Sequence, residues 1–216
     1  MILKDLKKRI FTSFLLLALV FLIYSNNFVL VYSLIILGVL SIIEFLNISK
    51  KIFYNYFYIF SVNSFFIIYL FLYCFFFFFF SNFPQLKIIL FSLLFGCIAS
   101  DIGGFIFGKI FKGPKLTKIS PNKTISGAIG SIIMTWITIS CSIFYFTNFI
   151  SYDFFIISIF TSISCQLGDL LFSFLKRKAK IKDTGNFLPG HGGILDRLDG
   201  IFLGIPFGFI SFILIY

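Results

Sequence analysis

The chain carries little charge and almost no histidine. Only 12% of its 216 residues are Asp, Glu, Lys or Arg, and His191 is the single histidine. Soluble domains carry about 25% charged residues, so this composition excludes a water-soluble globule. Hydrophobic residues make up 59% of the sequence, and the mean hydropathy is +1.05. Both values indicate an integral membrane protein.

Patterned cysteines and a cleavage signal are also missing. The four cysteines stand singly in apolar stretches, with neither metal-ligand spacing nor a disulfide framework, and we interpret them as small apolar residues. Basic residues at 4–9 precede an apolar run, as in a signal peptide, but no small-residue cleavage site follows. We therefore expect a first membrane span there. The sequence contains no internal repeat and no stretch typical of a soluble domain.

Phenylalanine, in contrast, is abundant. The sequence has 36 phenylalanines, including the run 75–80. An aromatic recognition surface is one interpretation. Lipid-facing filler is the interpretation we favour, because the residues follow no motif and Phe enters a bilayer favourably wherever it falls.

Apolar stretches long enough to form membrane spans recur along the whole chain. A span needs about 20 residues, and the candidates are 10–25, 28–48, 52–80, 86–108, 126–147, 153–175 and 199–216. The third stretch contains Ser61, Asn63 and Ser64, which leaves open a broken pair of helices. The pattern predicts an all-α integral membrane protein with about seven transmembrane helices.

The basic residues favour one orientation. If the N-terminus is cytoplasmic and the seven spans alternate, every one of the 18 Lys and Arg residues except Lys87 lies on the cytoplasmic side, in agreement with the positive-inside rule. Splitting the third stretch would put the last two basic loops opposite the first two. We therefore expect a cytoplasmic N-terminus, a C-terminus outside, and cytoplasmic loops at 109–126 and 176–198.

Acidic residues gather at the same membrane edge. Those on the cytoplasmic loops or near them are Glu44, Asp101, Asp169, Asp183, Asp196 and Asp199. An ionised carboxylate inside the bilayer is costly unless a cation, a partner or water compensates it. Helix–helix pairing with a Lys or Arg is one explanation. Carboxylates that enter from three spans at one depth, opposite basic loops, favour a metal or substrate site.

The first basic loop is suited to binding phosphate. Its lysines alternate with Gly, Pro and hydroxyl residues, and it ends in Ser-Pro-Asn-Lys-Thr at 120–124, where a helix begins. Ammonium groups, backbone N–H groups and a helix N-terminus all bind phosphate oxygens. A loop that only anchors the topology would also contain lysines, but it would not need this turn.

The second basic loop combines a tight turn with carboxylates. Gly and Pro surround His191, and Asp196 and Asp199 follow three residues apart, on one face of a helix start. Carboxylates beside phosphate-binding cations are the ingredients of Mg²⁺-assisted phosphoryl or nucleotidyl transfer. A lone histidine is more often structural, but its glycine neighbours favour a role in the site.

The segment 173–199 resembles the signature of the phosphatidate cytidylyltransferases, also called CDP-diacylglycerol synthases. It reads Ser-x-x-Lys-Arg, then Lys-Asp-x-Gly, then Leu-Pro-x-His-Gly-Gly-Ile-x-Asp-Arg-Leu-Asp. Gln166-Leu-Gly-Asp169, the 120–124 turn and Asp101-x-Gly-Gly extend the resemblance upstream. Ile102 stands where relatives have a hydroxyl residue, and Ser126 stands where they have an acid. The resemblance implies N-terminal transmembrane helices at 1–95, about three spans, and a catalytic transmembrane region at 96–216.

The resemblance implies a reaction of membrane phospholipid biosynthesis. A phosphate oxygen of phosphatidic acid attacks the α-phosphorus of CTP, which gives CDP-diacylglycerol and diphosphate. The implied partners are CTP, phosphatidic acid, membrane lipid and a second copy in a homodimer, without nucleic acid. The implied location is the inner (plasma) membrane, with the active site facing the cytoplasm. A polyprenol or phytol kinase, a cation-coupled transporter and a non-catalytic scaffold are the alternatives.

The resemblance also assigns roles to individual residues. The expected catalytic residues are Asp169, Asp196, Lys176, Arg197 and Asp199. The expected substrate-binding residues are Lys123, Ser120, Asn122, Thr124, Arg177, Lys182, Asp183, His191, Gly192 and Gly193. Mg²⁺, alone or with a second metal or a monovalent cation, is expected on Asp169, Asp196 and Asp101. We expect Asp196 to lie close to Asp169.

Overall fold

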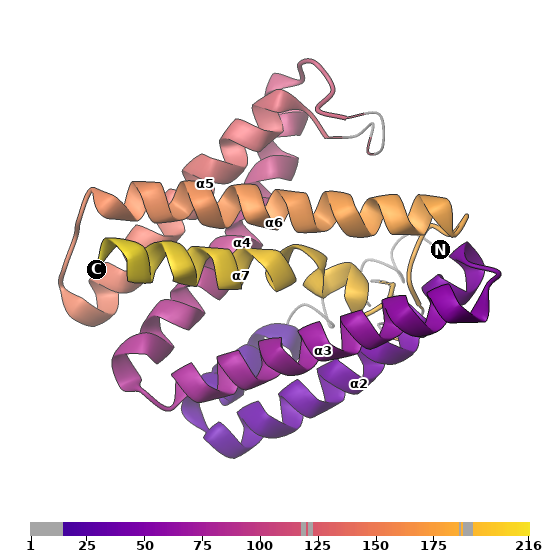
Figure 1. Cartoon of the computed structure of the whole chain (residues 1–216). Helices are drawn as coiled ribbons and strands as arrows, with labels where there is room; N and C mark the ends of the chain where they lie inside the picture. The colour runs from indigo at the N-terminus through magenta and orange to yellow at the C-terminus, as the bar shows by residue number, and fades with distance from the viewer. Residues whose placement is uncertain (1–14, 118–119, 121–122, 186, 188–191) are drawn as a thin grey trace. The chain divides into compact units, whose positions relative to one another are not determined.

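The computed structural model describes residues 15–117, 120, 123–185, 187 and 192–216 (Figure 1). Its helices are α2 (Asn27–Ile52), α3 (Tyr56–Ser81), α4 (Pro84–Phe111), α5 (Ile125–Thr147), α6 (Asp153–Lys178) and α7 (Leu195–Ile215). A shorter apolar helix, Leu15–Ser25, precedes them. An isolated antiparallel bridge pairs Lys115 with Thr124.

The six helices α2 to α7 are each long and apolar enough to cross a membrane. The prediction of an all-α, multi-pass membrane protein is therefore confirmed. Their ends differ by four residues or fewer from the predicted spans. From Tyr56 onward, the stretch 52–80 forms one continuous helix, α3, without a break at its polar residues. The predicted first span, 10–25, lies partly outside the described residues, and its described part is helical.

The local sequence explains where several helices begin. The Asn26 side chain accepts the N–H of Phe28 at 2.9 Å ahead of α2, and Asn55 accepts that of Phe57 at 2.9 Å ahead of α3. Such caps satisfy backbone donors that have no partner within the helix. Pro84 opens α4, where a missing N–H has no consequence.

The chain folds as two compact units. The first comprises Met1–Asn82 and Leu175–Leu198, and the second comprises Phe83–Phe174 and Asp199–Tyr216. The last residues of α6, the α6–α7 connection and the start of α7 thus belong with α2 and α3. The assignment of catalysis to 96–216 stays a prediction.

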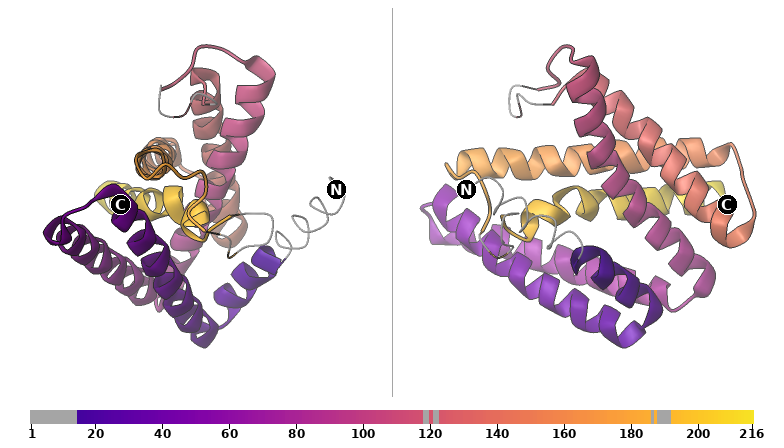
Figure 2. Two further views of the ribbon diagram at one scale, coloured as in Figure 1. Left: turned by 90° about the vertical axis from the view of Figure 1, so that its right-hand side faces the viewer. Right: turned by 180° about the vertical axis from the view of Figure 1, so that it is seen from behind.

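Small residues bring α4 and α5 into close contact in the second unit. On α4 they recur every four residues: Gly96, Ser100, Gly104 and Gly108. A Cβ on Gly104 would lie 2.8 Å from Ser131 Oγ, and one on Gly127 would lie 2.7 Å from the Gly104 oxygen. Ser131 Oγ also donates to the Ser100 carbonyl at 2.7 Å. This packing of small residues with interhelical hydrogen bonds is typical of membrane helices, and the two helices lie side by side in both views of Figure 2.

Glycines on α7 serve the same purpose against α6 and α4. A Cβ on Gly200 would lie 2.6 Å from Cys165 Sγ, and one on Gly204 would lie 2.5 Å from Cys97 Sγ. Both cysteines are buried, and all four cysteines of the chain are free thiols. These contacts support the interpretation of the buried cysteines as small packing residues.

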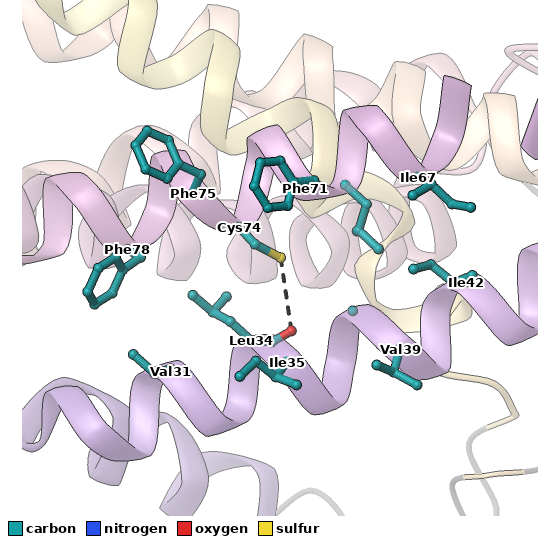
Figure 3. A pocket seen from close by; sticks show the side chains of 12 residues that line it. Val31, Leu34, Ile35, Val39, Ile42, Ile67, Phe71, Cys74, Phe75 and Phe78 are labelled. Atoms are coloured by element: carbon teal, nitrogen blue, oxygen red, sulfur yellow. Dashed lines mark hydrogen bonds between the residues drawn. The ribbon is translucent and has the colours of Figure 1, made fainter. Parts of the chain in front are cut away.

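In the first unit, α2 and α3 pack against each other through apolar side chains. The rings of Phe45 and Phe66 stack with their centroids 3.9 Å apart. Farther along the pair is a cavity of about 410 Å³, lined entirely by apolar side chains and Cys74 (Figure 3). The Cys74 thiol points to the Leu34 carbonyl at 3.9 Å. None of the described residues that line this cavity is charged, so none could orient a polar substrate.

Several aromatic side chains of α3 are highly exposed. The side chains of Phe57, Phe60, Phe65 and Phe71 are each at least 70% exposed. Such exposed rings suit a helix surrounded by lipid. The distribution supports the interpretation of the phenylalanines as lipid-facing filler.

Candidate active site

Asp196, in the first turn of α7, lies at the centre of a polar cluster in the first unit. Its Oδ1 accepts from Lys176 Nζ at 2.7 Å, and its Oδ2 accepts from the backbone N–H groups of Thr184 at 2.8 Å and Gly193 at 3.0 Å. The Lys176 and Asp196 side chains are only 13% and 9% exposed. A carboxylate so removed from water needs a paired cation and hydrogen bonds, and this one has both.

A second carboxylate enters this cluster from α2. Glu44 Oε2 accepts from Thr184 Oγ1 at 2.7 Å and from the N–H of Leu195 at 2.9 Å, while Oε1 accepts from the N–H of Ile194 at 2.9 Å. The predicted site residues include neither Glu44 nor Thr184. The sequence did contain a signal for Glu44, because a carboxylate inside an apolar span needs donors. It contained none for Thr184.

Gly192, another predicted residue, lies against this cluster. Gly192 has φ +81°, a conformation that favours glycine, and a Cβ there would lie 3.0 Å from Asp196 Oδ2. Other predicted residues that are exposed are Arg177, Lys182, Asp183 and Arg197. His191 lies outside the described residues.

In the second unit, Lys123 forms an ion pair with Asp169 of α6. Ser173 Oγ lies 3.5 Å from Asp169 Oδ1, and the Lys123 and Asp169 side chains are 26% and 28% exposed. One turn earlier on α6, Gln166 Nε2 donates to the Ala128 carbonyl of α5 at 3.3 Å. This bond holds α6 against α5, whose first residue follows Lys123 by two positions.

A closed loop between α4 and α5 presents Lys123. The Leu116 N–H donates to the Lys123 carbonyl at 2.8 Å, and the Lys123 N–H donates to the Ser120 carbonyl at 3.1 Å. Thr124 caps α5 by accepting the N–H of Gly127 at 3.1 Å. Ser126, where the sequence departs from the family pattern, donates to the carbonyl of Lys112. Asn122 lies outside the described residues.

Two further acids lie where α4, α6 and α7 meet within the second unit. Cys165 Sγ lies 4.0 Å from Asp101 Oδ1. Asp199 is 7% exposed and its Oδ1 accepts the N–H of Gly200 at 2.9 Å, while its carbonyl packs against Gly168. Ile102, beside Asp101, is 48% exposed and apolar, so it adds no hydroxyl to this region.

The donor set fits Mg²⁺ in kind. In the part of the chain that the structure describes, no three His, Cys, Asp or Glu side chains come together as a complete metal cage. Mg²⁺ does not require such a cage, since it commonly binds through one or two carboxylates together with substrate phosphates and water. Asp101 and Asp169 in the second unit and Asp196 in the first supply ligands of that type.

The structure thus joins the predicted residues in two sets. Asp196 lies with Lys176 and Gly193 in the first unit, and Asp169 lies with Lys123 in the second. Because Asp169 and Asp196 belong to different units, their expected proximity stays a prediction. The roles in catalysis and binding that the sequence assigned also stay predictions.

Comparison with known proteins matches a family model to almost the whole chain and individual relatives to about half of it. A family model described as "Cytidylyltransferase family" matches residues 4–215. Among curated proteins, the phosphatidate cytidylyltransferase of Rickettsia felis (strain ATCC VR-1525 / URRWXCal2) is 42% identical over 134 residues, which cover 56% of this chain and 58% of that relative.

Two other bacteria supply similar matches. The phosphatidate cytidylyltransferase of Helicobacter pylori (strain ATCC 700392 / 26695) is 41% identical over 115 residues, covering 52% of this chain and 42% of that protein. The one from Mycobacterium leprae (strain TN) is 38% identical over 112 residues, covering 51% and 36%. The chain therefore matches about half the length of these relatives, or less.

Substitution of Thr124 tests whether its hydroxyl caps α5. Thr124→Ala removes the acceptor for the Gly127 N–H and should destabilise the protein by about 1 kcal/mol, measured as a lower melting temperature in one detergent. Thr124→Ser keeps the hydroxyl and should melt close to wild type. Equal melting of the alanine variant and the wild type would contradict the cap.

Proposed function

The chain belongs to the cytidylyltransferase family, and we propose that it is a phosphatidate cytidylyltransferase. In the proposed reaction, a phosphate oxygen of phosphatidic acid forms a bond to the α-phosphorus of CTP. The bond from that phosphorus to the oxygen bridging to the β-phosphorus breaks. The products are CDP-diacylglycerol and diphosphate.

The observation that carries the proposal is the pairing of a lysine with each of two expected catalytic carboxylates. Lys176 pairs with Asp196, and Lys123 pairs with Asp169. Lysines bind phosphate oxygens as point charges, so each pair contains a cation that suits a phosphate group. The attacking phosphate is already an anion and requires no strong base. Catalysis then depends on positioning the reactants and neutralising their charge.

We propose that Asp169, Asp196 and Asp101 hold Mg²⁺. When bound, Mg²⁺ would neutralise charge on the triphosphate and orient it. The residues of the chain have their own tasks: Lys123 and Lys176 bind phosphate oxygens, and the loop 112–124 presents the first of these lysines. Exposed Arg177, Lys182 and Arg197 add positive charge that attracts an anionic nucleotide.

We also propose that the active site faces the cytoplasm, where CTP is found, in the inner (plasma) membrane. The homodimer that the resemblance implies is part of this proposal. The distribution of basic residues supports a cytoplasmic N-terminus and an external C-terminus.

A reporter fused after Tyr216 tests this orientation. If the C-terminus is outside, a fused protein that fluoresces only in the cytoplasm should give no fluorescence. A fused enzyme that is active only outside should give activity. The reverse pair of results would contradict the seven-span orientation.

The activity is tested with purified protein, Mg²⁺, phosphatidic acid and CTP labelled on either the α- or the γ-phosphate. Cytidylyl transfer predicts label in the lipid only from α-labelled CTP, and diphosphate as the second product. A kinase would transfer the γ-label, and that result would refute the proposal.

Two substitutions test the assigned carboxylates in the same assay. Asp169→Asn and Asp196→Asn should each lower the rate by about 10²- to 10³-fold. Asp153→Asn is the matched control. Asp153 is the first residue of α6, and its Oδ2 accepts a hydrogen bond from Ser151 Oγ at 2.6 Å. The rate of this variant should stay near that of the wild type. Full activity in either Asn variant would remove that residue from the catalytic set.

A further inference from the structure

Glu44 lies more than 130 residues before the α6–α7 connection, yet the connection surrounds its carboxylate. Thr184 is 140 positions away along the chain, and Ile194 and Leu195 are 150 and 151 positions away. All three donate to Glu44 at 2.7–2.9 Å, and Glu44 is only 6% exposed. The buried Glu44 carboxylate is therefore held by specific hydrogen bonds to this part of the chain.

The groups around Glu44 are all hydrogen-bond donors. An ionised carboxylate can only accept hydrogen bonds, and every one of these partners donates. Two of the donors are the N–H groups of Ile194 and Leu195 at the start of α7. These amides have no partner within the helix, and the N-terminus of a helix favours negative charge. Glu44 thus fixes the position at which α7 begins.

Two glycines of the α6–α7 connection fit closely around Glu44. A Cβ on Gly185 would lie 2.7 Å from Glu44 Oε1, and one on Gly193 would lie 2.5 Å from Glu44 Oε2. Neither position has room for a side chain while the carboxylate is there. These glycines therefore have a reason to be small that does not involve a substrate.

Thr184 connects Glu44 to the expected catalytic carboxylate. Its N–H donates to Asp196 Oδ2 at 2.8 Å, and its hydroxyl lies 2.7 Å from Glu44 Oε2 and 3.1 Å from Asp196 Oδ2. The single hydroxyl hydrogen goes to the nearer acceptor, Glu44. One residue therefore serves both acids, with its backbone on Asp196 and its side chain on Glu44.

We propose that Glu44 is a positioning residue for the reaction. Through Thr184 and the first amides of α7, it holds the Asp196 carboxylate at Lys176. Glu44 itself touches no reacting atom. The inference rests on the proposed function, because the reaction that Asp196 serves is part of that proposal.

The test compares substitutions at both ends of this connection in the CDP-diacylglycerol assay. Glu44→Gln keeps the shape but puts a donor against a donor, and Thr184→Val keeps the shape but removes the hydroxyl. Each should lower kcat about 10- to 100-fold, as loss of a supporting hydrogen bond does in other sites, with a much smaller change in KM for CTP. Thr184→Ser retains the hydroxyl and should restore most of kcat.

A double variant shows whether the two residues act together. If they do, Glu44→Gln with Thr184→Val should be about as impaired as the worse single variant, because the second change removes an interaction already lost. Multiplication of the two losses would overturn the inference. Ser49→Ala is the control: Ser49 is 1% exposed on the same helix and donates within it, to Leu46 O at 3.0 Å.

The outcomes also separate the inference from the function on which it rests. Wild-type kcat in both Glu44→Gln and Thr184→Val would overturn the inference alone. An equal loss in Ser49→Ala would overturn it too, since general loosening of α2 would then suffice. An inactive wild-type protein would overturn the proposed function and the inference with it.

Discussion

An ionised carboxylate within an apolar helix is stable only where donors and cations surround it, and this requirement organises the polar part of the molecule. Glu44 and Asp196 meet it with the same short connection between α6 and α7, which supplies backbone N–H groups from Thr184, Gly193 and the start of α7. Lys176 supplies the cation. The path of the connection is therefore determined by the acids that it must satisfy.

The second unit uses a different arrangement for Asp169. Its ion pair with Lys123 is about a quarter exposed, and the lysine comes from a loop that closes on itself by backbone bonds and ends in the Thr124 cap. Behind this loop, α4 and α5 approach closely because small residues line both helices. The close packing of α4 and α5 thus supports the loop that presents Lys123, while the Lys123–Asp169 ion pair stays partly exposed.

The sequence alone predicted most of the fold. The long apolar stretches predicted α2 to α7, because hydrophobic length is a local property that survives in any packing arrangement. The expected loops at 109–126 and 176–198 coincide with the connections after α4 and α6. Hydropathy could not identify the two compact units, in which the end of α6 joins α2 and α3.

The site residues were named from the sequence, but their contacts were not. The resemblance selected Asp169, Asp196, Lys123 and Lys176, whose roles stay predictions. It did not reveal Glu44 or Thr184 as partners, since a hydrogen bond across 140 residues leaves no periodic pattern. It assigned Thr124 to substrate binding, which stays a prediction, and the structure shows in addition that the Thr124 hydroxyl caps α5.

We infer that buried carboxylates hold the α6–α7 connection in place. Hydrogen–deuterium exchange of residues 179–195 tests it most directly, in the wild type and in Asp196→Asn, with residues 112–125 as the internal reference. Substitution of one acceptor oxygen should speed exchange of the Thr184 and Gly193 amides, while the Leu116 amide, bonded to Lys123 O, should be unchanged. Equal exchange of residues 179–195 in the two proteins would contradict the claim.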